Sequence, residues 1–178
     1  MVNSVRLFVL VVLSIFFLGA NAHTQVVVIP MGSDAAPLKN VVTVSEENGD
    51  FTDPVEAMKS ITDADENKRY LLVIGPGLYT LTETLVMKEY VEITGSGRDA
   101  TKLIGMVSTG SFNGTSALVQ GANNTGIRGL SIENQGNNAV AFGIYNSSSS
   151  LRISDINIEV SGGSGTNTGV YNAVSYTH

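Results

Sequence analysis

Two short phrases near the end of the chain decide the fold. Gly143-Ile-Tyr-Asn146 is followed by SSSSLRI, and Gly169-Val-Tyr-Asn172 is followed by AVSYTH. The second phrase begins 26 residues after the first. If other positions recur at the same offset, the chain is a stack of similar units, and if they do not, the echo is a coincidence.

The offset relates many other positions, and apolar residues fall on apolar residues. The segment LSIE at 130–133 falls on INIE at 156–159. The related apolar positions are Leu118, Ile144 and Val170, then Ile127 and Ile153, and then Leu130, Ile132, Ile156 and Ile158, with Ile104 and Met106 one step before Leu130 and Ile132. The two similar phrases therefore belong to a sequence repeat.

Each unit consists of short apolar pairs separated by Asn, Gly and Ser, which indicates short strands and turns. A unit of this kind cannot bury its inner face alone, so it must stack on its neighbours. We expect a right-handed parallel β-helix, in which each coil lies about 4.8 Å above the last. In a β-sandwich, the alternative, nothing would require matching residues at a constant offset.

The predicted β-helix domain spans 41–178 and is expected to be cut short at its C-terminal end, because the last coil begins at Gly169 without its second apolar strand. One short helix is predicted near 54–61, with Thr52 or Asp53 as its cap and Pro54 in its first turn. We expect this helix to cap the first coil. Residues 23–40 are predicted to form a strand and a linker.

The first 22 residues have the pattern of a secretory signal peptide. Arg6 precedes an apolar run over 7–20, and Ala20-Asn-Ala22 offers small residues before a cleavage point at His23. The run is shorter than the roughly 20 residues that a spanning helix needs. The sequence therefore predicts a secreted or cell-surface protein with no membrane span after signal cleavage.

Composition narrows the range of functions. The chain has no cysteine and a net charge of −6, with only 15% charged residues. The chain can therefore form neither a disulfide nor a thiolate metal site. The negative charge argues against nucleic acid and anionic membrane surfaces as partners.

Three acidic residues lie on the repeating coils: Glu133, Asp155 and Glu159. The offset stacks Glu133 on Glu159 on the outer face, where two like charges repel unless a cation relieves them. One interpretation is a calcium site that includes Asp155. The alternative is a solvated pair that water and salt screen.

Two tyrosines, Tyr145 and Tyr171, also stack, and each is followed by an asparagine. Such rings can pack against sugar rings in a glycan-binding groove. Stacked tyrosines also stabilise a sheet face without any ligand. Asn146 and Asn172 are predicted to form a ladder at a turn.

Several segments resemble the N-terminal half of pectin methylesterases and other pectin-lyase-like β-helix proteins. They are Val42-Thr-Val44, Gly49-Asp-Phe-Thr52 with the helix that follows, Ile74-Gly-Pro-Gly-Leu-Tyr79 and Val91–Ile104. The resemblance covers roughly 41–135. It implies the β-helix fold and says little about catalysis.

The catalytic motifs of pectin methylesterases have no clear counterpart. In that family, glutamines in QAVAL and QDTL segments help to hold the oxyanion, and two aspartates and an arginine lie on later coils. Here Asn138-Ala-Val-Ala-Phe142 has asparagine for the first glutamine, and Thr166–Gly169 has neither glutamine nor aspartate. The resemblance thus assigns no catalytic residue.

The sequence favours a secreted, non-catalytic β-helix protein that acts in glycan binding or adhesion. The alternative is a fragment of a pectinesterase-like or polysaccharide lyase-like enzyme, a carbohydrate-active protein whose catalytic coils lie beyond residue 178. No cofactor other than calcium is expected. A polysaccharide or cell-surface glycan is the expected partner, and exposed coil ends allow end-to-end self-association.

Overall fold

The computed structural model describes residues 40–173. The predicted signal peptide at 1–22 and nearly all of the 23–40 segment lie outside these residues and remain predictions. The described elements are β1 (Asn40–Val44), α2 (Pro54–Ser60), β2 (Tyr70–Ile74), β3 (Gly77–Leu81), β4 (Leu85–Val86), β5 (Val91–Gly95), β6 (Thr101–Gly105), η1 (Gly114–Ser116), β7 (Ala117–Gln120), β8 (Gly126–Gln135), β9 (Val140–Ser147), β10 (Arg152–Ser161) and β11 (Thr166–Ala173).

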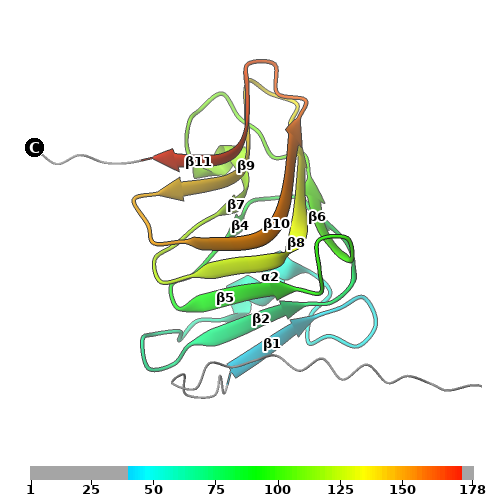
Figure 1. Cartoon of the computed structure of the whole chain (residues 1–178), viewed down its shortest axis with the longest axis vertical. Coiled ribbons are helices and arrows are strands. Elements are labelled where there is room, and N and C mark those ends of the chain that lie inside the picture. The colour runs from blue at the N-terminus through cyan, green and yellow to red at the C-terminus, as the bar shows by residue number, and fades with distance from the viewer. Residues whose placement is uncertain (1–39, 174–178) are drawn as a thin grey trace, which may run out of the picture. The chain divides into compact units, whose positions relative to one another are not determined.

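The strands form a parallel β-solenoid of about five turns. Every pairing between named strands in the described part is parallel. A seven-stranded sheet holds β1, β2, β5, β8, β6 and β3, with β10 added on β8, and a four-stranded sheet has the order β11-β9-β7-β4. Figure 1 shows β1, β2, β5, β8 and β10 stacked from bottom to top. The predicted fold class is confirmed as far as an all-β parallel solenoid.

Apolar side chains form the core in columns that run from coil to coil. Because paired residues of parallel strands lie directly above one another, each column joins the same position of successive coils. The columns are Val42–Leu72–Ile93–Ile127–Ile153, Tyr79–Leu103–Ile132–Ile158 and Leu85–Val119–Ile144–Val170.

The side chains of these columns are buried in the middle coils and partly exposed in the last described coil. Ile127 and Ile144 are fully buried, whereas Ile153 and Val170 are 38% and 36% exposed. Each of the two exposed residues has a neighbour on one side only among the described strands. The apolar core is therefore less completely covered at β10 and β11 than in the middle coils.

The 26-residue register is confirmed for β8 with β10 and for β9 with β11. Leu130 pairs with Ile156, and Val170 pairs with Ile144. The predicted pair of Leu118 with Ile144 is wrong by one residue, because Val119 occupies that position. The turn that leads to β8 is one residue shorter than the turn that leads to β10, so a constant offset fails there.

The register predicted for Ile104 and Met106 is also wrong. Leu103 pairs with Ile132, and Ile104 pairs with Glu133. Met106 lies outside the strand and is exposed. Leu103 and Val119 are 16 positions apart, whereas their counterparts Ile132 and Ile144 are 12 apart. The loop over 106–116 thus lengthens this coil, and with the shorter turn before β8 the offset becomes 29 residues.

The long strands β8 and β10 each bend once. Gly129 has a φ of +66° and Asp155 a φ of +50°, and these positions are equivalent in the register. The bend lets the first part of β8 pair with β5 and the second part with β6. A side chain on Gly129 would meet the Gly95 carbonyl oxygen at 3.0 Å, so glycine suits this turn for its left-handed backbone and for the close approach.

The predicted helix is present as α2. Asp53 is its N-cap, and the Asp53 carboxylate accepts a hydrogen bond from the Val55 backbone N–H at 2.7 Å. Val55, Ala57 and Met58 are buried in the main core. The sequence signals for the cap and for Pro54 at the helix start therefore located the helix correctly.

Candidate functional site

The two predicted tyrosines lie in register on the outer face of the four-stranded sheet. Tyr145 on β9 pairs with Tyr171 on β11. Their rings are stacked, with centroids 5.7 Å apart and planes 11° apart. The outward direction follows from the column below, where Val86 and Gln120 precede Tyr145 and Val86 is exposed.

A third ring, that of Phe142, completes this stack. Its centroid lies 4.8 Å from that of Tyr171 and 6.0 Å from that of Tyr145. Phe142 is fully buried and belongs to an apolar cluster that is separate from the main core. The sequence reasoning did not select Phe142 as a site residue.

A local bend places Phe142 and Tyr145 on the same face although they are three residues apart. The pairing of β9 with β7 and β11 is interrupted at Gly143. A side chain at Gly143 would lie 2.4 Å from Ile158 Cγ2 and 2.7 Å from the Gly169 carbonyl oxygen. Gly143 and Ile144 thus both face inward, and Phe142 and Tyr145 flank them on the outside.

The loop over 106–116 brings a fourth ring to the face. The Phe112 centroid lies 5.9 Å from the centroids of both Phe142 and Tyr171. Phe112 is 54% exposed, while Tyr145 is only 9% exposed. Phe112 and the half-buried Tyr171 therefore present the accessible ring surface, and Phe142 and Tyr145 support them. We name these four rings the aromatic platform.

A buried asparagine holds the Phe112 loop in place. The Asn134 side chain accepts a hydrogen bond from the Val107 N–H at 2.9 Å and donates to the carbonyl oxygens of Val107 and Phe142, both at 2.7 Å. Thr109 and Val140 exchange two further backbone hydrogen bonds. A buried amide with all its partners fixes the local geometry, so the loop is positioned by β8 and β9.

The segments that carry the aromatic platform contain no formally charged residue. Residues 103–127, 134–151 and 160–173 contain no Asp, Glu, Lys, Arg or His. The polar side chains of these segments are amides and hydroxyls. Among them, the Asn146 amide donates a hydrogen bond to the Asn172 amide oxygen at 3.0 Å, which confirms the predicted asparagine ladder. Rings beside neutral hydrogen-bonding groups can bind an uncharged ligand, but they supply no carboxylate for nucleophilic or acid–base catalysis.

Asn138, which the resemblance aligns with the family's oxyanion glutamine, forms a hydrogen bond with the backbone of the next residue. Its amide oxygen accepts from the Ala139 N–H at 2.7 Å. Thr166–Gly169 lies in β11 beside β9. Neither segment brings a carboxylate to the face.

Two of the three acidic residues predicted as a calcium site, Glu133 and Asp155, form ion pairs with basic side chains. Glu133 and Glu159 are in register as expected, and Lys102 Nζ lies 3.0 Å from Glu133 Oε1. The hydrogen bond and the charge of Glu133 raise the pKa of Lys102, and Glu159 adds to the rise. Asp155 pairs instead with Arg98 at 3.0 Å.

Within residues 40–173, no group of three or more His, Asp or Glu side chains is arranged to hold a metal ion. The like-charge repulsion that motivated the calcium interpretation is relieved by Lys102. Calcium binding by Glu133, Asp155 and Glu159 stays a prediction. In the same part of the chain, no helix has the length and apolar character needed to cross a membrane.

No protein-family model matches the sequence, and no curated protein matches it. Solved structures do match. One is a pectin methylesterase mutant in complex with hexasaccharide IV, with a TM-score of 0.54 and 18% identity, over 72% of this chain and 47% of that chain. A pectin methylesterase in complex with hexasaccharide VII matches with a TM-score of 0.54 and 16% identity, over 72% of this chain and 47% of that chain.

Pectin methylesterase PemA from Erwinia chrysanthemi matches with a TM-score of 0.56 and 15% identity, over 78% of this chain and 46% of that chain. The chain thus spans about half the length of these solved structures. At such low identity, the likeness concerns the backbone arrangement alone. With the parallel coils and their apolar columns, it identifies the fold of this chain as a pectin-lyase-like β-helix.

Proposed function

We propose that this chain is a non-catalytic glycan-binding protein of the cell exterior and that the aromatic platform is its binding surface. The observation that carries the proposal is the combination of exposed rings with an uncharged surround. Tyr171 and Phe112 offer accessible ring surface, and residues 103–127, 134–151 and 160–173 lack formal charges.

A sugar ring suits this surface on physical grounds. Its C–H groups pack against the face of an aromatic ring, and its hydroxyls need neutral hydrogen-bond partners. Asn172 is exposed beside Tyr171, and Asn167 is exposed on the same strand. Because Tyr145 is nearly buried, we assign the ligand contact to Tyr171 and Phe112 and a supporting role to Tyr145.

The export of the protein is part of the proposal. It rests on the predicted signal peptide at 1–22. Two of the similar solved structures are complexes with hexasaccharides, which supports a polysaccharide or a cell-surface glycan as the ligand. Attachment to such a glycan would serve adhesion.

A second candidate function is part of a pectinesterase-like or polysaccharide lyase-like enzyme. The observation that favours it is the likeness to pectin methylesterases, of which this chain spans about half. In that case, the carboxylates would have to come from outside residues 40–173, because the aromatic platform has none beside it.

We also propose that α2 covers the N-terminal end of the coil stack. Its buried face joins the main core, where Val55, Ala57 and Met58 contribute to the same cluster as Val44 of β1. Covering an apolar end prevents strand-edge association there.

The test is a calorimetric titration of the chain with a panel of uncharged hexasaccharides: glucan, xylan, mannan and fully methyl-esterified galacturonan. We expect one of them to bind and Tyr171→Ala to weaken its affinity about tenfold or more. Val86→Ala is the matched control, because Val86 is exposed on the same outer column, three coils below Tyr171.

Two results would overturn the proposal: no binding across the panel, or equal affinity of wild type and Tyr171→Ala. Catalysis is tested separately by methanol release from methyl-esterified pectin and by the absorbance of unsaturated lyase products. Either activity would favour the enzyme alternative.

A further inference from the structure

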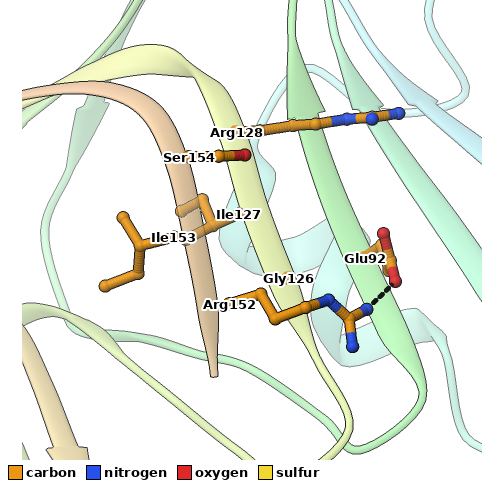
Figure 2. Close-up of a pocket in the computed structure, with 7 residues that line it drawn as sticks. All are labelled: Glu92, Gly126, Ile127, Arg128, Arg152, Ile153 and Ser154. Atoms are coloured by element: carbon orange, nitrogen blue, oxygen red, sulfur yellow. Dashed lines mark hydrogen bonds and ion pairs between the residues drawn. The ribbon is translucent and has the colours of Figure 1, made fainter. Parts of the chain in front are cut away.

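A second surface feature lies on the seven-stranded sheet and does not involve the aromatic platform. It is a pocket with a volume of about 430 Å³ on strands β5, β8 and β10. Figure 2 shows the Arg128 and Arg152 side chains projecting to the same side of these strands, with Ser154 beside Arg128.

A glycine in the outer column creates the hollow. Glu92, Gly126 and Arg152 are stacked in register on three successive coils, so a side chain is missing in the middle layer. A Cβ atom on Gly126 would lie 3.4 Å from Glu92 Oε2 and 3.8 Å from Arg152 Nη2, which are ordinary contacts. Arg152 extends across the gap and forms an ion pair with Glu92 (Figure 2).

The neighbouring column carries Arg128, which pairs in register with Thr94 below and Ser154 above. Within residues 40–173, every other Lys and Arg side chain lies at a carboxylate or a backbone carbonyl. Arg128 has no such partner in this part of the chain. Its guanidinium is therefore available to a ligand.

The local charge balance is positive although the chain is acidic. Glu92 is shared between Arg152 and Arg69, whose Nη2 lies 3.6 Å from Glu92 Oε1. With Arg128, which lines the same pocket as Glu92 and Arg152, this part of the sheet has three guanidinium groups and one carboxylate, in a chain of net charge −6. A planar guanidinium binds an oxyanion with two parallel hydrogen bonds, and a second cation nearby strengthens the attraction.

We propose that this pocket binds a single oxyanion carried on a sugar, and specifically the carboxylate of a uronic acid residue in an acidic glycan. Arg128 would hold the carboxylate, Arg152 would add charge from the adjacent coil, and the Ser154 hydroxyl would donate a hydrogen bond. The acidic surface of the remaining chain opposes nucleic acid, whose many phosphates need an extended basic surface. A sulfate ester shares the oxyanion chemistry and is distinguished by the experiment.

The choice of a sugar as the carrier rests on the proposed glycan binding, whereas the pocket itself does not involve the aromatic platform. The experiment measures how much more tightly the chain binds a galacturonate hexasaccharide than the same hexasaccharide as its full methyl ester. The two ligands differ in charge at each carboxyl group, so their affinity ratio reports an anion site. We expect a ratio of at least tenfold in 50 mM NaCl and a marked fall at 500 mM NaCl.

Variants locate the site. Arg128→Gln removes the unpaired charge, and Gly126→Val fills the hollow and leaves every charge in place. We expect both to reduce the acid-to-ester ratio about tenfold. Lys59→Gln is the charge-matched control, because Lys59 lies on α2 and pairs with Glu56 and Glu83. It should leave the ratio within about twofold of wild type.

Three outcomes would overturn the proposal. They are a wild-type ratio near one, a ratio that is unchanged in both Arg128→Gln and Gly126→Val, and binding of a sulfated galactan hexasaccharide without binding of the galacturonate. Thermal unfolding of each variant shows whether it is folded. Tyr171→Ala should change acid and ester binding equally, so failure of the aromatic platform and failure of this pocket give different results.

Discussion

The two sheets stabilise the same stack of coils with different side chains on their outer faces. On the four-stranded sheet, the rings of Phe142, Tyr145 and Tyr171 stack without a charged residue beside them. On the seven-stranded sheet, ion pairs such as Lys102–Glu133 and Arg152–Glu92 join neighbouring or next-neighbour coils. Ring stacking excludes water, whereas exposed ion pairs remain hydrated and contribute little to stability. We therefore expect mutations on the aromatic side to affect stability more than mutations on the charged side.

The largest effect is expected for Phe142→Ala. The fully buried ring contacts three other aromatic rings, so its removal leaves a cavity between β9 and β11. The free energy of unfolding should fall by about 3–5 kcal/mol, measured by urea denaturation. Phe112→Ala is the matched control on the same face and should cost about 1 kcal/mol or less, because that ring is exposed. Equal losses in the two variants would contradict a buried role for Phe142.

A smaller difference is expected between two glycines, one on each sheet. Gly143→Val forces a side chain to within 2.4 Å of Ile158 Cγ2, and overpacking of this kind costs about 1–3 kcal/mol. Gly126→Val places its Cβ at ordinary contact distance, so its stability should stay within about 0.5 kcal/mol of wild type. Urea denaturation of both variants provides the measurement. If Gly143→Val is as stable as Gly126→Val, the inward bend of β9 is wrong.

The smallest effect is expected from acid. Hydrogen bonds from the Thr43 N–H and hydroxyl lower the pKa of Asp50, and hydrogen bonds from Lys68 and Tyr70 lower the pKa of Asp63. A lowered folded-state pKa stabilises the fold above the ordinary carboxyl pKa, near 4, and the contribution is lost as the pH falls through the folded-state value. Both groups are exposed and lie near β1 and β2, so the loss should be small and local.

Hydrogen exchange measured at pH 5 and at pH 2.5, corrected for intrinsic rates, tests this expectation. Protection should fall in residues 40–74 and stay constant in β9 and β11, where no carboxyl group is present. Asp50→Asn should remove part of the change. An equal loss of protection in β9 would mean that the two faces do not differ in their acid response.

Much of the fold could be predicted because a solenoid repeats its own pattern. Matching Leu130 and Ile132 with Ile156 and Ile158 needed only the sequence, since the same turn lengths lie between these positions. Leu118 was misplaced because one turn differs by a residue, and turn length leaves no mark on the apolar pattern. Asp53 and Pro54 revealed α2 because capping is a local interaction.

The sites were less predictable for a physical reason. The stack of Tyr145 on Tyr171 follows from the repeat, but Phe112 reaches it from a loop whose path depends on the buried Asn134. The pocket between Arg128 and Arg152 depends on a missing side chain at Gly126, and the sequence does not show which face a glycine leaves open. The residues that surround a loop or a missing side chain are determined by the three-dimensional fold, so the sequence alone does not identify them.

The difference in turn length has a consequence for how such a protein can change over evolution. Gln120 and Gly126 are six positions apart, and their counterparts Tyr145 and Arg152 are seven apart, yet both coils keep their registers. A residue gained or lost at this corner leaves every column intact, whereas the same event inside β8 or β9 would exchange inner and outer side chains. We therefore expect length variation among descendants of this gene to gather at the corners, and duplication of a whole coil to succeed when both breakpoints fall there.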